Sequence, residues 1–371
     1  MINRIRKSFA RAVECKHGGK VQEAASILGR EPLDFSANIN PLGYPPLEEL
    51  IAEEIKNIAH YPDSSYGGLC RAAAKFADVD QDCIVPGNGS SELIRLMAEA
   101  CLEEGKLALV PTPSFGEYTN QSLLAGASVE KIEIGEDGLP VLDQGLLESA
   151  DLLFLCNPNN PTGILTEKKD LLRVLARTER EKTWFILDEA FVDFVPGETL
   201  LREAAFSTRL ITLRSLSHFF AMPGLRTGYM VSNPEVIRKI QEKKEPWGLN
   251  SLAQFMASES LRDMAYVDRT LAYTQEEREN LILGLRGIPG FIPYPGSANY
   301  LLVQLHPSLD LTAADLRERL IPRGILIHDC RSFHHIGPYF FRVAVRTRKE
   351  NHLLLKALGQ VHKQMVKPGK G

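Results

Sequence analysis

The chain has 371 residues, of which 44% are hydrophobic and 24% charged. This composition excludes a disordered, collagenous or coiled-coil protein and fits a globular one. Its 43 lysines and arginines against 47 acidic residues give a net charge of −4, so the sequence offers no broad basic surface for binding nucleic acid. At roughly 100–200 residues per domain, the length predicts two domains, or one large domain with a smaller satellite.

The cysteines and the apolar runs indicate a cytoplasmic protein without a membrane span. The six cysteines are scattered, with no C-x-x-C pair and no zinc-site spacing, so we expect reduced thiols and no metal. Apolar runs such as Leu152–Cys156 fall far short of the about 18–20 residues that span a bilayer, and the N-terminus lacks an apolar signal-peptide core. The basic start of the chain could imitate a transit peptide, but we favour a short surface or dimer-arm helix.

Short apolar runs alternate with helical patterns from about residue 80 to 232. The predicted strands are Leu107–Val110, Leu152–Cys156, Trp184–Leu187, Leu210–Leu213 and Tyr229–Val231. Strands that alternate with helices of this length predict parallel βαβ units, and hence an α/β fold with a mostly parallel sheet. In such sheets ligands bind beyond the carboxyl ends of the strands, and there this chain has its polar, Gly- and Pro-rich turns.

The pattern changes after Trp247. A long helical stretch is predicted over about Ser251–Gly287. The later predicted elements are strands at Tyr300–Leu305, Ile325–Ile327 and Phe340–Val345, and helices near Ala313–Ile321 and Glu350–Val366. We expect a smaller α+β domain that the first forty residues complete. The expected regions are therefore 1–45, an N-terminal arm with part of the small domain; 46–250, the large domain; and 251–371, the rest of the small domain.

The first candidate binding loop is Gly87-Asn-Gly-Ser-Ser-Glu92, which precedes the amphipathic run Leu93–Leu102. A glycine-bearing turn that opens a helix exposes backbone N–H groups at the positive end of the helix dipole, and such a place suits an anion, above all a phosphate. The alternative is that Ser90 or Ser91 only caps the helix.

Two further candidate segments follow predicted strands. The run Leu155-Cys-Asn-Pro-Asn-Asn-Pro-Thr-Gly163 carries two prolines and a glycine, which fix a polar turn and hold the amides of Asn159 and Asn160 at a strand end. Asp188 comes directly after the apolar strand Trp184–Leu187, where a carboxylate stays ionised only beside a cation. A protonated ring nitrogen is such a cation, although a cap on the following helical segment would also explain Asp188.

Together with Leu213–Tyr229, which reads LRSLSHFFAMPGLRTGY, these segments resemble the fold-type-I pyridoxal phosphate (PLP) enzymes, in the histidinol-phosphate aminotransferase branch. The resemblance runs along essentially the whole chain. Further motifs are similar to those of the L-threonine-O-3-phosphate decarboxylase subfamily of cobalamin biosynthesis: His17-Gly-Gly19, Leu33–Gly43, Asp188–Phe194, Pro246-Trp247 with Asn250, and Arg342–Arg346. The resemblance implies a large domain that binds PLP and a small α+β domain.

The resemblance implies cofactor-binding roles for nine residues. The matched phosphate ligands are Ser90, Ser91, Ser215, Ser217 and Arg226. Phe115 matches the aromatic ring that stacks on the pyridine, Asn160 the donor to its 3-oxygen, and Asp188 the carboxylate that keeps the ring nitrogen protonated. Tyr61 matches a tyrosine that reaches the cofactor of the neighbouring subunit, so the resemblance also implies a homodimer with shared active sites.

For the substrate, the resemblance implies a small phosphorylated amino acid. Arg342 matches the arginine that binds its carboxylate. The other matched substrate contacts are His17, Gly18, Asn38 and Asn159. His328 stands where the subfamily has an arginine that helps to bind the substrate phosphate, and a neutral imidazole is a weaker phosphate ligand than a guanidinium. Arg331 is close enough in the sequence to compensate.

His218 stands where the family has its Schiff-base lysine, four residues before Met222. No lysine lies between Lys182 and Lys239, so a one-residue shift does not supply one. Imidazole cannot form a Schiff base, and we therefore expect PLP to be held without a covalent bond. Three interpretations of His218 stay open: a general base near neutral pH, as in sugar dehydratases of this fold; the mark of a paralogue that binds ligand without turnover; and an engineered substitution that traps a complex.

The resemblance thus predicts PLP-dependent decarboxylation of L-threonine-O-3-phosphate, or of a related phosphorylated amino acid, to aminopropanol phosphate. The expected catalytic residues are His218, Asp188 and Asn160, and His218 would replace the lysine in returning a proton to carbon. The alternatives are a histidinol-phosphate-type aminotransferase and a PLP- or ligand-binding paralogue without normal turnover.

Overall fold

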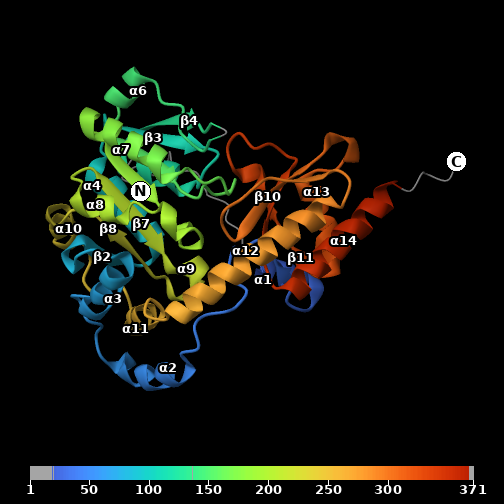
Figure 1. Ribbon diagram of the computed structural model, residues 1–371, viewed down its shortest axis with the longest axis horizontal. Coiled ribbons are helices and arrows are strands. Elements are labelled where there is room, and N and C mark those ends of the chain that lie inside the picture. Colours follow the sequence, from blue (N-terminus) through green and yellow to red (C-terminus); the bar gives the residue numbers. More distant parts are fainter. Residues whose placement is uncertain (1–18, 20, 136, 367–371) are drawn as a thin grey trace, which may run out of the picture.

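The computed structural model describes residues 19, 21–135 and 137–366 (Figure 1). Its larger sheet has seven strands in the order β2-β8-β7-β6-β5-β3-β4. Their bounds are β2 Ile84–Gly87, β3 Leu107–Thr112, β4 Ser128–Glu133, β5 Leu152–Cys156, β6 Trp184–Asp188, β7 Leu210–Ser215 and β8 Gly228–Val231. All five strands predicted in this region are present. The predicted strands did not include β2 and β4, because β2 is only four residues long and contains a proline, while β4 is largely exposed.

The larger sheet is parallel except at β8, which runs antiparallel to both β2 and β7. The expectation of parallel βαβ units is therefore wrong for this strand. Between β7 and β8 the described chain has only the four-residue helix α9 (Leu216–Phe219) and the 3-10 turn η7 (Pro223–Leu225). A parallel return needs a longer crossover, usually a full helix, so this short connection reverses the chain direction.

Helices cover both faces of the larger sheet, which explains its nearly continuous apolar strands. One face packs mainly on α3 (Gly67–Ala77), α7 (Lys168–Glu181), α8 (Leu201–Phe206) and α11 (Ser251–Ser260). The other face packs on α4 (Gly89–Cys101), α5 (Glu117–Ala125) and α10 (Pro234–Gln241). Successive residues of β6 alternate between the two cores: Phe185 and Leu187 enter the first, and Ile186 enters the second.

The smaller part is built on a four-stranded antiparallel sheet in the order β12-β13-β10-β9. Its elements are β9 Phe291–Pro293, β10 Tyr300–Leu305, β12 His328–Asp329, β13 Phe340–Ala344, α13 Ala313–Leu320 and α14 Arg348–Val366. A separate parallel pair joins β1 (Leu33–Asp34) to β11 (Ile325–Leu326), so the N-terminal segment lies with the C-terminal one. Helix α1 (Val21–Leu28) packs on the same region through Ala24. Figure 1 shows this part on the right, with α12 (Met264–Arg286) running between it and the larger sheet.

The helix expected over Ser251–Gly287 is two helices, α11 and α12 (Met264–Arg286). The chain breaks at Leu261–Asp263, where the Asp263 carboxylate accepts a hydrogen bond from the Tyr266 N–H and caps the start of α12. The expected domain boundaries at residues 45 and 250 stay predictions.

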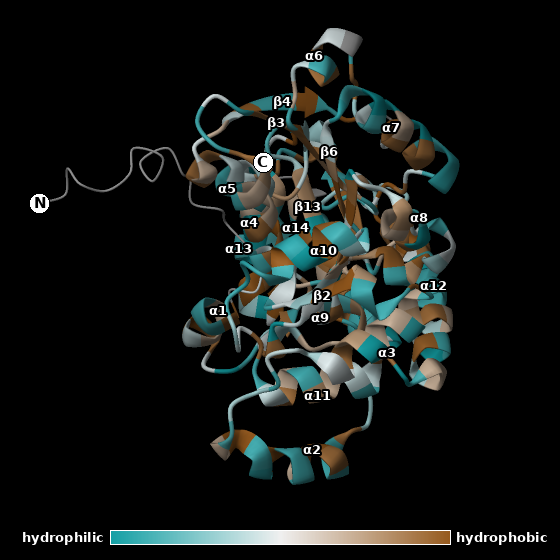
Figure 2. Cartoon of the chain, turned by 90° about the vertical axis from the view of Figure 1, so that its left-hand side faces the viewer, coloured by the Kyte–Doolittle hydropathy of each residue, from teal (hydrophilic) through white to brown (hydrophobic). Residues whose placement is uncertain are grey.

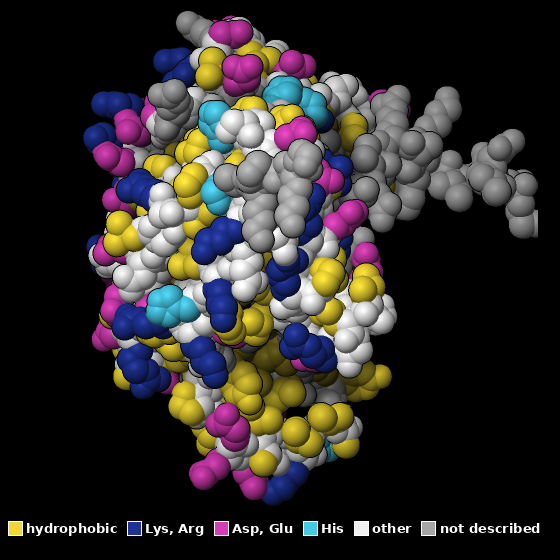
Figure 3. All heavy atoms as spheres, turned by 90° about the vertical axis from the view of Figure 1, so that its right-hand side faces the viewer, with side chains coloured by type: hydrophobic (Ala, Val, Ile, Leu, Met, Phe, Trp, Pro, Cys, Tyr) yellow, Lys and Arg dark blue, Asp and Glu magenta, His cyan; other side chains and the backbone are white. Residues whose placement is uncertain are grey.

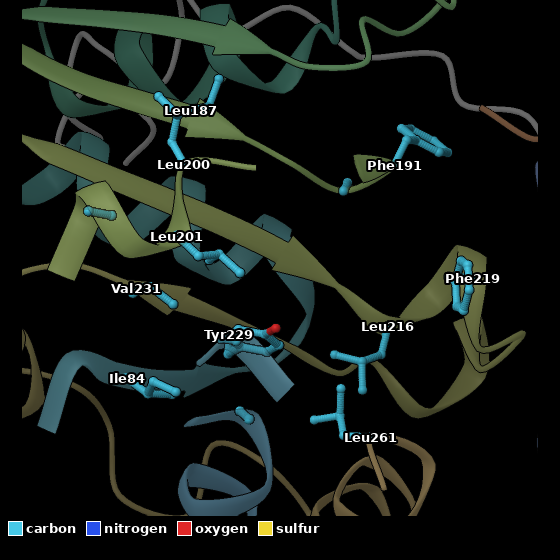
Figure 4. Close-up of a cluster of buried hydrophobic side chains, with 14 of the residues drawn as sticks. Ile84, Leu187, Phe191, Leu200, Leu201, Leu216, Phe219, Tyr229, Val231 and Leu261 are labelled. Atoms are coloured by element: carbon cyan, nitrogen blue, oxygen red, sulfur yellow. The ribbon is translucent and has the colours of Figure 1, made fainter. Parts of the chain in front are cut away.

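Helix α9 carries His218 and packs into the hydrophobic core on the face of the larger sheet that α3, α7, α8 and α11 cover. Figure 4 shows Leu216 and Phe219 among buried side chains of β8 and neighbouring segments, including Tyr229. Phe219 also packs against the ring of Phe194 at 4.9 Å. With both of its apolar residues buried, α9 gives His218 a rigid support.

The ends of β6 and β7 are tied together by a buried ion cluster. Arg214, on β7, has a side chain that is only 4% exposed and lies 2.9 Å from the Asp193 carboxylate and 3.5 Å from that of Glu189. Glu189 also accepts hydrogen bonds from the Thr199 hydroxyl and the Leu200 N–H. The two strand ends that carry Asp188 and Ser215 are thus held in fixed relation.

We expect Arg214→Met to lower the free energy of unfolding by about 3–5 kcal/mol, because it leaves two buried carboxylates without their cation. Arg95→Met is the matched control: it removes a partly exposed pair with Glu99 and should cost only about 0.5 kcal/mol. Urea unfolding followed by circular dichroism measures both. Equal losses in the two variants would show that the buried cluster does not hold the strand ends.

Candidate active site

The candidate site lies where the carboxyl ends of β5, β6 and β7 meet the beginning of α4. Asp188 ends β6 and Ser215 ends β7, while Asn159 and Asn160 follow β5. The register places Gly228 beside both Ser215 and Gly87, the residue at the end of β2. The segments singled out in the sequence therefore converge at one edge of the sheet.

The first group of site residues consists of Gly89, Ser90, Ser217 and Arg226, and its positive charge comes from the Arg226 guanidinium. The Arg226 guanidinium donates to the Ser217 hydroxyl and to the Pro223 carbonyl, each at 3.3 Å. Gly89 has a φ of +72°, and a Cβ at this position would collide with that guanidinium. Within the described ranges, no carboxylate lies within ion-pair distance of Arg226, so its charge is free to meet an anion.

The alternative that Ser90 or Ser91 only caps α4 is wrong. The N-cap is Asn88, whose side chain makes no capping bond, and the serines belong to the first helical turn. Ser90 is partly buried, whereas Ser91 is exposed. The N–H groups of this turn thus lack a side-chain cap and suit an anion together with Arg226. Ser215 does act as a cap: its hydroxyl accepts from the Ser217 N–H at 3.3 Å.

The Asp188 carboxylate is buried, and the hydrogen bonds it accepts from the described residues come from neutral donors. Its Oδ2 accepts from the Tyr118 hydroxyl at 2.7 Å, and its Oδ1 accepts from the Ala190 N–H at 3.0 Å. Burial raises the pKa of Asp188 to about 6, and these two hydrogen bonds oppose the rise. No lysine, arginine or histidine among residues 21–135 and 137–366 forms an ion pair with it. A cationic group that enters the site would therefore be strongly favoured beside Asp188.

Tyr118 is a site residue that the sequence reasoning missed. It lies fully buried on α5, stacked on Phe154 at 4.9 Å and edge-on to Phe115 at 5.6 Å. The available signal was its spacing, since it follows Phe115 by three residues and so lies one helical turn away. The structure thus places Phe115, Tyr118 and Asp188 in one connected group.

Arg342 is a second cation without a carboxylate partner among the residues described. Its guanidinium donates to the Asn160 Oδ1 and to the Ser36 carbonyl, and it lies 5.2 Å from the centre of the Tyr300 ring. The side chain is buried, and its Nε has no hydrogen-bond partner. Asn160 and Arg342 thus lie in direct contact, and no carboxylate of the described residues pairs with Arg342.

Asn159 and Asn38 are both buried and serve first to hold backbone segments. The Asn159 Nδ2 donates to the Pro113 carbonyl and the Thr162 hydroxyl, both at 2.9 Å. The backbone carbonyl of Asn38 accepts a hydrogen bond from the side-chain amide of Asn299. The Oδ1 atoms of both Asn38 and Asn159 have no hydrogen-bond partner in the described structure, so each is available to a ligand.

His218 projects from α9 beside the N-terminal segment. Its Nδ1 lies 3.0 Å from the Asn38 carbonyl, and its ring stacks on Phe191 at 4.4 Å. Burial lowers the pKa of His218 to about 4, and the charges of Arg342 and Arg226 lower it further, against the Asn38 hydrogen bond. The imidazole is therefore neutral near pH 7.

The four remaining predicted site residues are His328, Tyr61, His17 and Gly18. His328 is buried on β12, directly across from Arg342 in the strand register, and its ring lies 5.7 Å from that of Phe333. Tyr61 is 82% exposed, and its ring lies 4.8 Å from that of Trp247; no contact recorded among the described residues joins it to the site of its own chain. His17 and Gly18 lie outside the described residues.

Arg331 is half exposed and pairs with Asp329 at 2.7 Å. Its charge is therefore already matched by Asp329. The part of the chain that the structure describes contains no cluster of three or more histidine, cysteine, aspartate or glutamate side chains arranged for a metal. It also contains no helix long and apolar enough to cross a membrane.

Comparison with known proteins places the chain among related sequences and folds. Residues 30–358 match the family model described as aminotransferase class I and II. The chain is 36% identical over 355 residues to the threonine-phosphate decarboxylase of Salmonella typhimurium, covering 93% of this chain and 96% of that protein. It is 34% identical over 356 residues to the histidinol-phosphate aminotransferase of Methanothermobacter thermautotrophicus, covering 93% of each.

Among solved structures, the chain is similar to the histidinol-phosphate aminotransferase from Sinorhizobium meliloti in complex with pyridoxal-5'-phosphate. The TM-score is 0.85, with 98% of both chains covered at 21% sequence identity. At that identity the similarity supports the fold alone.

The raised pKa of Asp188 predicts a pH-dependent effect of Asp188→Asn on the ligand-free chain. The folded protein keeps this proton up to about pH 6, whereas an unfolded aspartate loses it near its ordinary pKa of 3.8. The stabilisation by the proton is thus complete below the unfolded pKa and is lost as pH rises through about 6. Relative to wild type, the variant should gain about 3 kcal/mol of unfolding free energy between pH 3.5 and pH 8.

Urea unfolding at the two pH values measures this difference. Asp310→Asn, at an exposed turn, is the matched control and should show the same effect at both. A pH-independent effect of Asp188→Asn would contradict the account of a buried, unpaired carboxylate.

Proposed function

Because the chain belongs to the aminotransferase class I and II family, we propose that it binds PLP and decarboxylates L-threonine-O-3-phosphate, or a related phosphorylated amino acid, to aminopropanol phosphate. Membership of this PLP-dependent family confirms the resemblance and the fold class predicted from the sequence. The observation that carries the substrate proposal is Arg342, a buried guanidinium with no carboxylate partner among the described residues, since the carboxylate of an amino acid would supply that partner. The 36% identity to a threonine-phosphate decarboxylase supports the choice of reaction.

The residues of the site fit PLP at both ends of the molecule. The uncapped first turn of α4 and the unpaired Arg226 suit the cofactor phosphate. The buried Asp188 suits a protonated ring nitrogen, because it lacks a cation of its own within the described chain. We propose Ser90, Ser217 and Arg226 as the main phosphate ligands.

Ser91 and Ser215 are proposed as lesser phosphate ligands, because Ser91 is exposed and the Ser215 hydroxyl already caps α9. Phe115 is proposed to stack on the pyridine ring. The partly buried Asn160 is proposed as the donor to its 3-oxygen through Nδ2, since its Oδ1 is occupied by Arg342.

PLP, when bound, supplies an electron sink for the bond that breaks at the substrate Cα. Asp188 would hold the proton on the ring nitrogen, with Tyr118 and Ala190 fixing its two oxygens. Arg342 would bind the substrate carboxylate and set its orientation, and this orientation decides which bond at Cα breaks. Asn38 and Asn159 offer unpaired Oδ1 atoms for further substrate contacts.

His218 is proposed to act in proton transfer, because its imidazole cannot form a Schiff base with the cofactor but can accept and return a proton. The neutral imidazole accepts a proton before it can return one to carbon. We therefore propose that PLP is held non-covalently. We also propose that the step without a lysine, in which the incoming amino acid condenses with the cofactor aldehyde, limits the rate of turnover. The interpretations of His218 as the mark of a silent paralogue or as an engineered trap predict binding without turnover.

An aminotransferase that acts on histidinol phosphate is the second candidate function. The observation that favours it is the 34% identity to a histidinol-phosphate aminotransferase over nearly the whole chain. His328 at the position of the subfamily's phosphate-binding arginine also weakens the specific match to the decarboxylases. His17, Gly18 and His328 remain proposed substrate contacts.

The test is an absorption spectrum of the purified protein with added PLP, before and after threonine phosphate, with CO₂ followed in the same sample. Release of CO₂ supports the decarboxylase. Release of an oxo-acid from an amino donor, without CO₂, would instead establish the aminotransferase. A spectral change that persists without product would overturn both enzyme functions in favour of a binding protein.

We expect His218→Ala to lower the rate of turnover by roughly 10²–10⁴-fold, the usual contribution of a positioned proton-transfer group. Affinity for PLP should stay nearly unchanged, because the phosphate and ring contacts come from other residues. His306→Ala, at an exposed position, is the matched control and should leave both quantities unchanged. Unchanged turnover in His218→Ala would contradict a role for the imidazole in the reaction.

We also propose a homodimer that shares its active sites through Tyr61. The segment of α2 (Glu48–Glu54) and η3 (Ile55–Ala59) projects from the body of the molecule (Figures 1 and 2). Hydrophobic side chains gather at this end of the molecule (Figure 3). The exposed ones on or near this segment are Leu50, Ile55, Ile58, Tyr61 and Trp247. A second copy of the chain would bury this apolar surface.

The free thiols of the described cysteines support a cytoplasmic location.

Ile58→Glu should convert this dimer to monomers, because it places a charge in the apolar contact. Ile27→Glu is the matched control, since Ile27 on α1 is equally exposed, at 64%. Light scattering after gel filtration measures the mass of each variant. A monomeric wild type, or a dimer that persists in Ile58→Glu, would refute this interface.

A further inference from the structure

The backbone carbonyl oxygen of Asn38 accepts hydrogen bonds from two side chains. It lies 3.0 Å from the His218 Nδ1 and 2.9 Å from the Asn299 Nδ2. A carbonyl oxygen cannot donate a hydrogen bond, so the His218 Nδ1 must carry the proton of this contact. In a neutral imidazole the other nitrogen, Nε2, then carries a lone pair and no proton.

The His218 ring is held in this orientation from several sides. It stacks on Phe191 at 4.4 Å with an angle of 23° between the two planes. The backbone carbonyl of His218 accepts from the Asn40 N–H at 3.0 Å, so the turn that contains Asn38 is docked on α9 at two points. The charged groups that act on the ring are Arg342 and Arg226, and both disfavour the imidazolium form.

Asn299 connects this arrangement to the strand that carries Arg342. Its backbone carbonyl accepts from the Val345 N–H at 2.8 Å, just beyond the end of β13. Its side chain is completely buried, and its Oδ1 has no hydrogen-bond partner in the described structure. The amide nitrogen must point to Asn38, because only the NH₂ group can donate to a carbonyl. Asn299 therefore has one side-chain hydrogen bond, and it goes to the oxygen that His218 uses.

We propose that Asn299 is a positioning residue for His218: by holding the Asn38 carbonyl in place, it keeps the neutral imidazole as the Nδ1–H tautomer and makes Nε2 the proton-accepting atom of the site. Proton transfer by His218 then takes place at Nε2 alone. A proton taken there converts the ring to imidazolium by forming the Nε2–H bond, and its return breaks that same bond. Nδ1–H stays bonded to Asn38 throughout.

The inference deepens the proposed function and rests on it only for the identity of the proton's partner. The tautomer can be measured without PLP and without turnover. Failure to release CO₂ would thus overturn the proposed function and leave the tautomer assignment standing, whereas a wrong tautomer would overturn the inference alone.

The experiment is solid-state nitrogen NMR of the full chain labelled with ¹⁵N-histidine at pH 7.5, with and without PLP. Protonated and bare ring nitrogens give separate signals, and each is assigned to Nδ1 or Nε2 through its correlation with ring carbons. The signals of His218 are those lost in His218→Asn, a change that keeps a donor near the Nδ1 position. We expect a single set for His218, with a protonated Nδ1 and a bare Nε2.

In Asn299→Ala we expect this single set to be lost and replaced by signals from both tautomers, because the Asn38 carbonyl is no longer held. Asn299→Asp, which keeps the shape of the side chain but not the NH₂ donor, should give the same result. Asn280→Ala, an exposed asparagine on α12, is the matched control and should keep the wild-type signals.

The inference is overturned if wild-type His218 shows a protonated Nε2 with a bare Nδ1, or an imidazolium at pH 7.5. It is also overturned if the two Asn299 variants keep the wild-type tautomer. The wild-type spectrum decides the tautomer even if a variant at Asn299 fails to fold.

Discussion

The buried carboxylate of Asp188 is the constraint on which the rest of the site depends. A carboxylate in this place is costly unless a cation or several donors meet it, and the described chain supplies only the Tyr118 hydroxyl and the Ala190 N–H. The strand that carries Asp188 is fixed to its neighbour through Arg214, so the carboxylate cannot relax toward solvent. The fold thus maintains a negative charge whose partner has to come from outside the described protein.

The two unpaired cations complement this charge. Arg226 lies by the uncapped first turn of α4, whereas Arg342 belongs to β13 of the smaller sheet and donates a hydrogen bond to Asn160. A cationic ring, a phosphate and a carboxylate would satisfy Asp188, Arg226 and Arg342 in turn. These three groups are the ones that the proposed PLP and amino-acid substrate would supply, which agrees with the family of the chain.

The sequence identified the residues that end strands, because turn chemistry and apolar runs are local. Asp188 and Asn160 are predicted in this way, whereas Arg226 is implied only by the resemblance to the family. Tyr118 and Asn299 were missed, because each acts through one hydrogen bond to a residue at least 70 positions away. Helix α11 was joined to α12 in the prediction because their apolar pattern continues across the break, where the Asp263 cap decides the boundary.

The central proposal of this account is that the site holds PLP without a covalent bond, since the resemblance places His218 where the family has its Schiff-base lysine. The most direct measurement is the mass of the PLP-loaded chain after borohydride reduction. The account predicts that PLP stays with the native protein through gel filtration and leaves no added mass after reduction and unfolding, while His218→Lys gains a phosphopyridoxyl label at that position. A label on any lysine of the unaltered chain would contradict the account.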